Sequence, residues 1–314
     1  MMNEENLTII TEFILVGLSG DSHLQFLLFL IFLCIYIITV LVNTTVIILY
    51  RISPNLHTPM YFYLANFSFL EICYITSTVP KMLSTFLSKH KTISFSGCAT
   101  QMYCFLLLGG TECYMLAVMA YDRYHAICHP LLYTINMNRR ICIRLIGGSL
   151  LVGAINSLIH TVLTFTLPFC RNTVNHFFCD IPPLLKLACI DTWVNETAIF
   201  LISGCVIVGS FILTMISYTH IISTILRIRS TSGRNKSFST CASHFTVVTI
   251  FYGSGIFMYF RPKSSYSMDQ DRMIAVMYTI IAPLLNPFIY SLRNRDVKIA
   301  VKKLMIKLSS SKTL

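Results

Sequence analysis

Long apolar stretches without a charged side chain are the most constraining feature of this sequence, and three of them stand out. Residues 24–50, 197–226 and 273–292 contain no Asp, Glu, Lys or Arg. An α-helix needs about 20 consecutive apolar residues to cross the hydrocarbon core of a bilayer, and a charge inside that core is costly. These three stretches therefore predict membrane-spanning helices.

Four further stretches have similar length and few charges, and the span that contains residues 273–292 is taken to begin one residue earlier, at Arg272. Only 12% of the residues are charged and the mean hydropathy is +0.68, whereas soluble domains have about 25% charged residues. A transmembrane β-barrel would show alternating segments of about 10 residues, but these runs are continuous and longer. We predict an all-α membrane protein, a single domain over residues 1–314, whose seven spanning helices cover residues 24–50, 58–80, 98–121, 141–167, 197–226, 237–260 and 272–292.

The distribution of basic residues predicts the orientation of the helices. If seven spans alternate in direction, 16 Lys and Arg residues fall on the side of the C-terminus and 8 on the side of the N-terminus. The side richer in Lys and Arg faces the cytoplasm. We therefore expect a multi-pass plasma-membrane protein with its N-terminus outside. The net charge of +11 then reflects a cytoplasmic face and not nucleic-acid binding.

The segments predicted to lie outside carry glycosylation acceptors and cysteines. Asn6, in Asn-Leu-Thr, is the better acceptor, because Asn195, in Asn-Glu-Thr, lies close to a span. Eight of the 12 cysteines fall in or beside spans and are interpreted as small buried hydrophobic residues. The oxidising exterior favours disulfides among the other four, and spacing leaves all three pairings open. These four are Cys98, Cys170, Cys179 and Cys189.

The residues after the seventh span predict a short amphipathic helix over 293–308. Val297, Val301, Leu304 and Leu308 share one stripe, with lysines around it. Such a stripe is typical of a helix that lies on anionic membrane lipid.

An acid and a base stand together where the third span reaches the cytoplasm. Asp122 and Arg123 are adjacent in "MAYDRYHAIC", residues 119–128. One interpretation is an interfacial anchor, since an arginine at a helix end can extend to the headgroups. The other is a functional pair, in which the acid neutralises and holds the arginine.

Several longer motifs identify the chain as similar to the odorant receptors, a family of rhodopsin-like G-protein-coupled receptors. They are "EFILVGL" (12–18), "HTPMYFYLANFSFLE" (57–71), "MAYDRYHAIC" (119–128), "SYTHII" (217–222), "KSFSTCASH" (236–244), "FYGSGIFMY" (251–259) and "PLLNPFIYSLRN" (283–294). The phrase "LANFSFLEIC" resembles the tetrapod-type class more than the fish-like class.

The resemblance implies more than the residues show by themselves. It implies the disulfides Cys98–Cys179 and Cys170–Cys189, and coupling to a stimulatory olfactory-type G protein that raises cyclic AMP. Together with the resemblance, the charged pair leads us to the hypothesis of a latch, in which Arg123 pairs with Asp122 at rest and is freed on activation, with Tyr218 and Tyr290 as candidates to receive it. The residues that we expect to take part in activation are Asp122, Arg123, Tyr124, Tyr218, His244, Asn286, Pro287 and Tyr290.

One departure from other rhodopsin-like receptors lies in the sixth span. Residues 237–260 contain neither the tryptophan nor the proline on which many of those receptors bend this helix; Tyr252, Gly253 and Gly255 occupy the region. A glycine pair can allow bending, but the sequence does not define the pivot.

Two acids are predicted to lie inside the membrane. Glu71 and Glu112 each fall in the middle of a span, where a carboxylate needs a partner or a proton. The resemblance brings them near Asn43 and Asn286. Either these four residues hold a sodium ion, which we favour, or the two carboxyl groups share a proton. No other cofactor is expected.

A ligand is expected between the helices in the outer half of the bundle. No catalytic motif is found, so we predict a receptor and not an enzyme. The expected pocket has no basic residue unless one reaches in from the rim, which favours a small, neutral, hydrophobic odorant over a carboxylate. Gly109 and Gly110 either make room for it or let helices pack closely. The expected lining is Phe105, Leu106, Gly109, Gly110, Ile202, Ser203, Val206, Tyr252, Gly255, Ile256, Tyr259, Val276, Thr279 and Ile280.

The sequence disfavours two other functions, those of a transporter and of a peptide receptor. Transporters often contain internal repeats, and no repeat relates the halves of this chain. A receptor for a peptide is disfavoured by the short outer tail, whereas a lipid ligand stays open.

Overall fold

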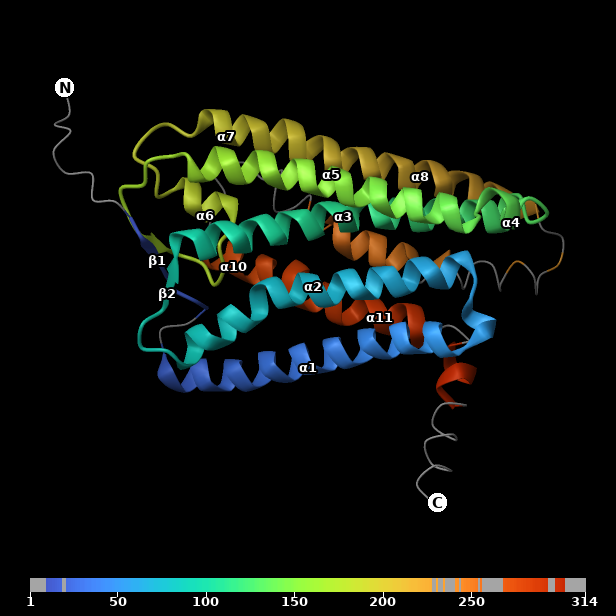
Figure 1. Ribbon diagram of the computed structural model, residues 1–314, viewed down its shortest axis with the longest axis horizontal. Helices are drawn as coiled ribbons and strands as arrows, with labels where there is room; N and C mark the ends of the chain where they lie inside the picture. The colour runs from blue at the N-terminus through green and yellow to red at the C-terminus, as the bar shows by residue number, and fades with distance from the viewer. Residues whose placement is uncertain are drawn as a thin grey trace, which may run out of the picture.

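The computed structural model describes residues 10–18, 21–227, 230, 234, 241–242, 244–253, 255, 268–292 and 297–302. Long helices lie along one common direction and form an elongated bundle, with α3 in its middle (Figure 1). The long helices are α1 (Ser22–Ile52), α2 (Pro59–Leu87), α3 (Phe95–Cys128), α5 (Arg139–Phe165), α8 (Gly204–Arg227) and α11 (Ala282–Leu292). Residues His244–Gly253 form a further apolar helical segment.

Shorter elements extend or connect these helices. Two π-helical turns are continuous with long helices: η3 (Ile199–Ser203) joins α7 (Trp193–Ala198) to α8, and η5 (Met277–Ile281) joins α10 (Met268–Val276) to α11. The connecting elements are η2 (Pro54–Leu56), α4 (Tyr133–Asn136) and α6 (Ile181–Leu185).

Five helical stretches of the described residues are long and apolar enough to cross a membrane: His23–Ile52, Phe95–Cys128, Arg139–Phe165, Trp193–Arg227 and Gln270–Ile289. The second predicted span corresponds to α2, which has 29 residues but is less apolar because it carries Glu71 and Lys81. The sixth predicted span, 237–260, lies partly outside the described residues. Helix α3 runs to Cys128, so Asp122 and Arg123 lie within a helix and not after its end.

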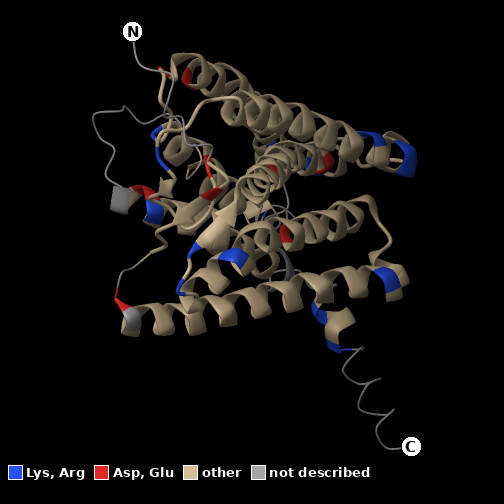
Figure 2. Ribbon diagram, turned by 60° about the vertical axis from the view of Figure 1, so that its left-hand side comes forward, with Lys and Arg blue, Asp and Glu red and all other residues tan. Residues whose placement is uncertain are grey.

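The surface of the bundle is apolar where a soluble protein would be polar. Leu41 on α1, Phe69 on α2 and Phe200 on η3 are each about 60% exposed. The middle stretches of the helices carry few charges, while Lys and Arg gather toward the ends of the bundle (Figure 2). This distribution suits a lipid environment, in which apolar side chains gain nothing by turning inward.

Helices α3 and α5 approach each other through glycines. A Cβ added to Gly110 would lie 3.1 Å from the Cα atom of Gly153, and a Cβ added to Gly153 would overlap the carbonyl oxygen of Leu107. The two backbones therefore touch, which only small residues permit. Gly109 differs, because its added Cβ would make only an ordinary contact with Tyr74, at 3.6 Å.

A small sheet covers one end of the bundle. Strand β1 (Glu12–Leu15) pairs antiparallel with β2 (Thr92–Ser94) and parallel with β3 (Thr173–Val174), in the order β2-β1-β3. Phe13 and Leu15 are fully buried beneath the sheet. The chain then turns at Gly17, whose φ of 80° favours glycine.

The structure contains the two disulfides that the resemblance implied. Cys98–Cys179 links the start of α3 to the loop that follows α5, and Cys170–Cys189 closes that loop on itself. Gln101 on α3 adds a further link, because its Oε1 atom accepts a hydrogen bond of 3.0 Å from the Cys179 backbone. The loop is thereby held over the end of the bundle.

Candidate functional site

A cavity of about 80 Å³ lies between α3, α5, α8 and the helical segment His244–Gly253. Its walls are mostly aromatic and aliphatic, and no Lys, Arg, Asp or Glu is among its described lining residues. Such a lining suits a small apolar ligand. The described lining residues are Tyr74, Phe105, Leu106, Gly109, Gly110, Cys113, Asn156, Ser203, Val206, Ile207, Phe251, Tyr252, Gly255 and Tyr278.

The sequence predicted much of this lining. Eight predicted residues line the cavity: Phe105, Leu106, Gly109, Gly110, Ser203, Val206, Tyr252 and Gly255. Ile256 and Tyr259 lie outside the described residues. Ile202, Val276, Thr279 and Ile280 are not among the described lining residues; the last three are buried in the packing between helices.

The predicted cavity-facing residues of the last span differ from the observed ones next to a π-helical turn. The prediction assumed 3.6 residues per turn, but η5 inserts a wider turn before α11. The wider turn changes which side chains face the cavity, and Tyr278 lines it in place of Val276, Thr279 and Ile280. Periodicity also missed Asn156, because no residue of the fourth span was placed in the pocket.

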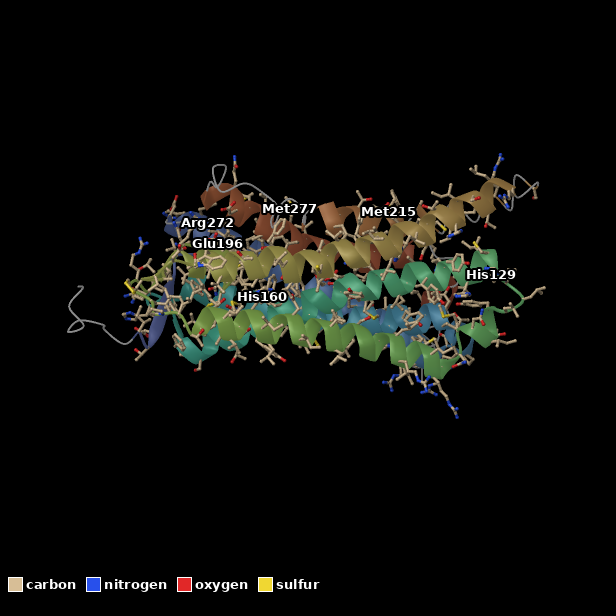
Figure 3. The ribbon with its side chains drawn as sticks, turned by 90° about the horizontal axis from the view of Figure 1, so that it is seen from above. His129, His160, Glu196, Met215, Arg272 and Met277 are labelled. Atoms are coloured by element: carbon tan, nitrogen blue, oxygen red, sulfur yellow. A yellow bond between two sulfur atoms is a disulfide. The ribbon has the colours of Figure 1, made fainter. Side chains whose placement is uncertain are left out.

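A buried polar cluster adjoins the cavity. The Oγ atom of Ser203 lies 2.8 Å from Nε2 of His160 and donates a hydrogen bond of 3.1 Å to Oδ1 of Asn156. His160 lies in the interior of the bundle, between the end that carries Glu196 and Arg272 and the end that carries His129 (Figure 3). All three members of the cluster are buried.

Two tyrosine hydroxyl groups of the lining are fixed by other partners. Tyr252 donates a hydrogen bond of 2.9 Å to the carbonyl oxygen of Cys113 and so ties the segment His244–Gly253 to α3. Tyr278 donates a bond of 3.3 Å to Oδ2 of Asp180, in the loop above the bundle. Tyr278 therefore connects the lining of the cavity to the loop that follows α5.

The two intramembrane acids meet at one asparagine. The Nδ2 atom of Asn286 donates to Oε1 of Glu71 and, at 3.5 Å, to Oε1 of Glu112. Both acids are buried. Oε2 of Glu71 and Oδ1 of Asn43 have no hydrogen-bond partner among the described residues. Pro287 follows in α11.

The opposite end of α3 holds the acid–base pair. Arg123 Nη2 lies 3.3 Å from Asp122 Oδ2, and Tyr133 on α4 donates a hydrogen bond of 2.8 Å to Asp122 Oδ1. Asp122 is 1% exposed and Arg123 is 14% exposed, so the pair is largely shielded. The sequence did not predict Tyr133 as a partner, because a loop separates it from α3.

Other predicted activation residues lie near this pair. The hydroxyl group of Tyr218 is 2.6 Å from Nδ1 of His244, which joins α8 to the sixth predicted span. Tyr124 is instead bonded to Nε2 of His129 at 3.0 Å. The side chain of Tyr290 lies outside the described residues. In this structure the hydroxyl group of Tyr218 is thus hydrogen-bonded to His244 and not to Arg123.

The outer loop contains two ionisable groups with shifted pKa values. Burial raises the pKa of Asp180 to about 6, although hydrogen bonds from Ile181 and Tyr278 act in the opposite direction. Burial lowers the pKa of His176 to about 3, helped by the charges of Arg272 and Lys186. His176, Cys179 and Asp180 are close in sequence and have side chains that can bind metals, but Cys179 is in a disulfide and they do not form a metal site.

The two glycosylation candidates differ in the structure. Asn195 is buried and its Nδ2 atom donates a hydrogen bond of 2.8 Å to the carbonyl oxygen of Leu163, so its amide is not available for modification. Asn6 lies outside the described residues, and its glycosylation stays a prediction.

The arrangement is that of a helical membrane protein with an enclosed cavity between its helices. The family model described as "Olfactory receptor" matches residues 32–308. Mouse olfactory receptor 5AR1 is 50% identical over 305 residues, covering 97% of this chain and 98% of that protein. Human olfactory receptor 5I1 is 52% identical over 303 residues, covering 96% of each chain. The chain therefore belongs to the olfactory receptor family.

Membership of this family defines the general activity. Olfactory receptors are G-protein-coupled receptors of the plasma membrane, with several membrane spans, that respond to odorants. They are receptors in sensory transduction and not enzymes.

Proposed function

We propose that this receptor binds a small, neutral, hydrophobic volatile in the cavity described above. The absence of a Lys, Arg, Asp or Glu side chain from its described lining carries the proposal, because a carboxylate or an amine would be buried there without a counter-charge. Its aromatic side chains offer apolar contacts, as in other small-molecule sites.

The ligand acts in a single domain that crosses the membrane seven times with its N-terminus outside. Five apolar helical stretches, the length of α2 and the apolar segment His244–Gly253 support the count. The charge asymmetry of the loops supports the orientation. The amphipathic segment 293–308 lies on cytoplasmic lipid in this proposal; within it, Val297 is buried against the bundle, and Leu304 and Leu308 lie outside the described residues.

Binding opens the cytoplasmic face to a stimulatory olfactory-type G protein, which raises cyclic AMP. The shielded pair of Asp122 and Arg123 supports a latch, since breaking it releases an arginine close to Tyr218 and His244. A ligand shifts this equilibrium only by its difference in affinity for the two states. The G protein must therefore contribute to the stability of the open state.

Cyclic AMP in cells that display the chain tests this proposal. Neutral volatiles should raise cyclic AMP while carboxylic acids should not, and Arg123→Ala should abolish the response at equal surface level. Asp122→Asn should raise basal cyclic AMP, because it removes the counter-charge that holds Arg123 at rest. Full signalling by Arg123→Ala would refute the latch, and a response confined to carboxylic acids would refute the ligand class.

A sodium ion at the intramembrane acids is a second proposal. No three His, Cys, Asp or Glu side chains gather as a metal site in the part of the chain that the structure describes, so two acids and amide oxygens would share the ion. The free oxygen atoms of Glu71 and Asn43 support it. Replacing sodium by N-methylglucamine should lower the melting temperature of the wild type but not of Glu112→Gln. Equal sodium dependence in both proteins would favour the shared proton instead.

A further inference from the structure

The polar cluster beside the cavity has a defined direction of hydrogen bonding. The Ser203 hydroxyl group has one proton and two neighbours, Nε2 of His160 and Oδ1 of Asn156. An amide oxygen only accepts hydrogen bonds, so the serine proton points to Asn156. His160 must then carry its proton on Nε2 and donate it to Ser203. The chain of donors runs from His160 through Ser203 to Asn156.

This direction leaves the NH₂ group of Asn156 as the end of the chain. Asn156 lines the cavity, and its Nδ2 atom lies 3.8 Å from the position that a Cβ on Gly110 would take. The amide therefore faces the space that the glycine leaves open. No group within the described ranges accepts a hydrogen bond from this NH₂.

The close contact of α3 and α5 places this amide. Gly110 and Gly153 let the two helices touch, and Asn156 follows Gly153 by three residues, nearly one helical turn. Two of the three tyrosine hydroxyl groups in the lining donate elsewhere, Tyr252 to Cys113 and Tyr278 to Asp180. The ring of the third tyrosine, Tyr74, stacks on Phe105. Asn156 thus presents to the cavity a side-chain donor that is available to a ligand.

We infer that this cavity selects odorants that carry a carbonyl oxygen, and that the amide of Asn156 donates a hydrogen bond to it. The inference rests on the proposed function of the cavity and names its ligand class. A ketone or aldehyde accepts the bond and has no donor of its own to leave unpaired. An alcohol must also bury its O–H group, and an alkane leaves the amide without a partner, and both are costly.

Matched sets of volatiles test this inference in cells that display the full chain, with cyclic AMP as the readout. Each set shares one carbon skeleton: cyclohexanone, cyclohexanol and cyclohexane; heptanal, heptanol and heptane; menthone, menthol and menthane. The carbonyl compound should be at least threefold more potent than the alcohol, and the alkane at least tenfold weaker than the carbonyl compound. Asn156→Leu should reduce the advantage of the carbonyl compound to less than twofold.

Two variants control this comparison. Ile155→Leu changes the neighbouring residue, which is 52% exposed on the outer surface of the bundle, and should leave the rank order intact. Ser203→Ala removes the hydroxyl group that donates to Asn156 Oδ1 and so frees Asn156 to rotate, which should partially reduce the same advantage. If Asn156→Leu fails to reach the cell surface, the potency order in the wild type and its change in Ser203→Ala test the inference instead.

The possible results separate this inference from the proposed function. Alcohols that are more potent than the matching carbonyl compounds would mean that the hydrogen bonds among His160, Ser203 and Asn156 run in the reverse direction, and would overturn the inference. Equal potency of alkanes would overturn it too, while leaving a volatile ligand in place. Silence toward every compound, with surface display confirmed, would count against the inference and the proposed function together.

Discussion

Single residues of the outer loop show how burial sets chemistry in this receptor. His176 is 1% exposed, stacks on Phe177 with ring centroids 4.7 Å apart, and neither ring nitrogen has a hydrogen-bond partner among the described residues. Because the buried ring resists protonation, it stabilises the loop through the packing of a neutral ring and not through a charge. A phenylalanine should therefore fit the same space.

His176→Phe should make the receptor less sensitive to acid. The folded-state pKa of His176 is about 3, below the ordinary 6.5. As the pH falls below about 6.5, the unfolded chain binds a proton that the folded state does not, and stability decreases by up to about 1.4 kcal/mol per pH unit. Melting temperatures of the purified receptor should be similar at pH 7 and higher for the variant at pH 5.

Asp180→Asn is the matched control for this experiment. The pKa of Asp180 is raised from 3.8 to about 6, so its contribution to stability is full below about 3.8 and is lost as the pH rises through about 6. Protonation of Asp180 in acid stabilises the folded state, whereas His176 destabilises it. Asp180→Asn should therefore make the loss of stability in acid steeper. A melting temperature of His176→Phe that follows the wild type from pH 7 to 5 would contradict this account.

The element scale explains which glycines the bundle requires. The sequence left open whether Gly109 and Gly110 make room for a ligand or let helices pack. The structure gives Gly110 both roles, since it lines the cavity and lies against Gly153. Gly109 lines the cavity without a close backbone contact. Only the pairing of α3 with α5 distinguishes these neighbours, because both glycines have the same local sequence context.

Gly153→Ala should destabilise the receptor by about 1–3 kcal/mol through overpacking. Its added Cβ would overlap the Leu107 carbonyl oxygen and lie 2.5 Å from Oγ1 of Thr111, and backbone cannot move aside without separating α3 from α5. Gly147→Ala on the same helix is the control, because nothing lies within 4 Å of its added Cβ. Surface level and melting temperature measure both variants, and equal values for the two would refute close packing at Gly153.

At the scale of the whole molecule, contacts between segments that are distant in the sequence hold the small sheet and the loop after α5 over one end of the bundle, and together these form its cover. Strand β1, the loop before α3 and the loop after α5 share one sheet. Arg272 in α10 donates a hydrogen bond of 2.9 Å to the carbonyl oxygen of Gly17. The cover therefore connects the N-terminal segment to the last part of the bundle.

Loss of Cys98–Cys179 should destabilise the receptor more than loss of Cys170–Cys189. The first pair is separated by 81 residues and the second by 19. A longer closed loop removes more entropy from the unfolded chain, and the difference amounts to about 1 kcal/mol. Thermal unfolding of the two double serine variants measures it. A larger loss from the shorter loop would show that native packing, and not chain entropy, dominates.

The sequence by itself determined the membrane class, the family and most of the cavity-facing residues of α3. Apolar length and charge placement are local properties, and helical periodicity assigns faces wherever the helix is regular. Only the tertiary structure decided that Tyr278 replaces the predicted face of the last span, that Tyr133 holds Asp122, and that Asn156 ends a donor chain in the cavity. These features depend on π-helical turns and on contacts between distant segments. Their energies arise between helices, so no pattern within one segment encodes them.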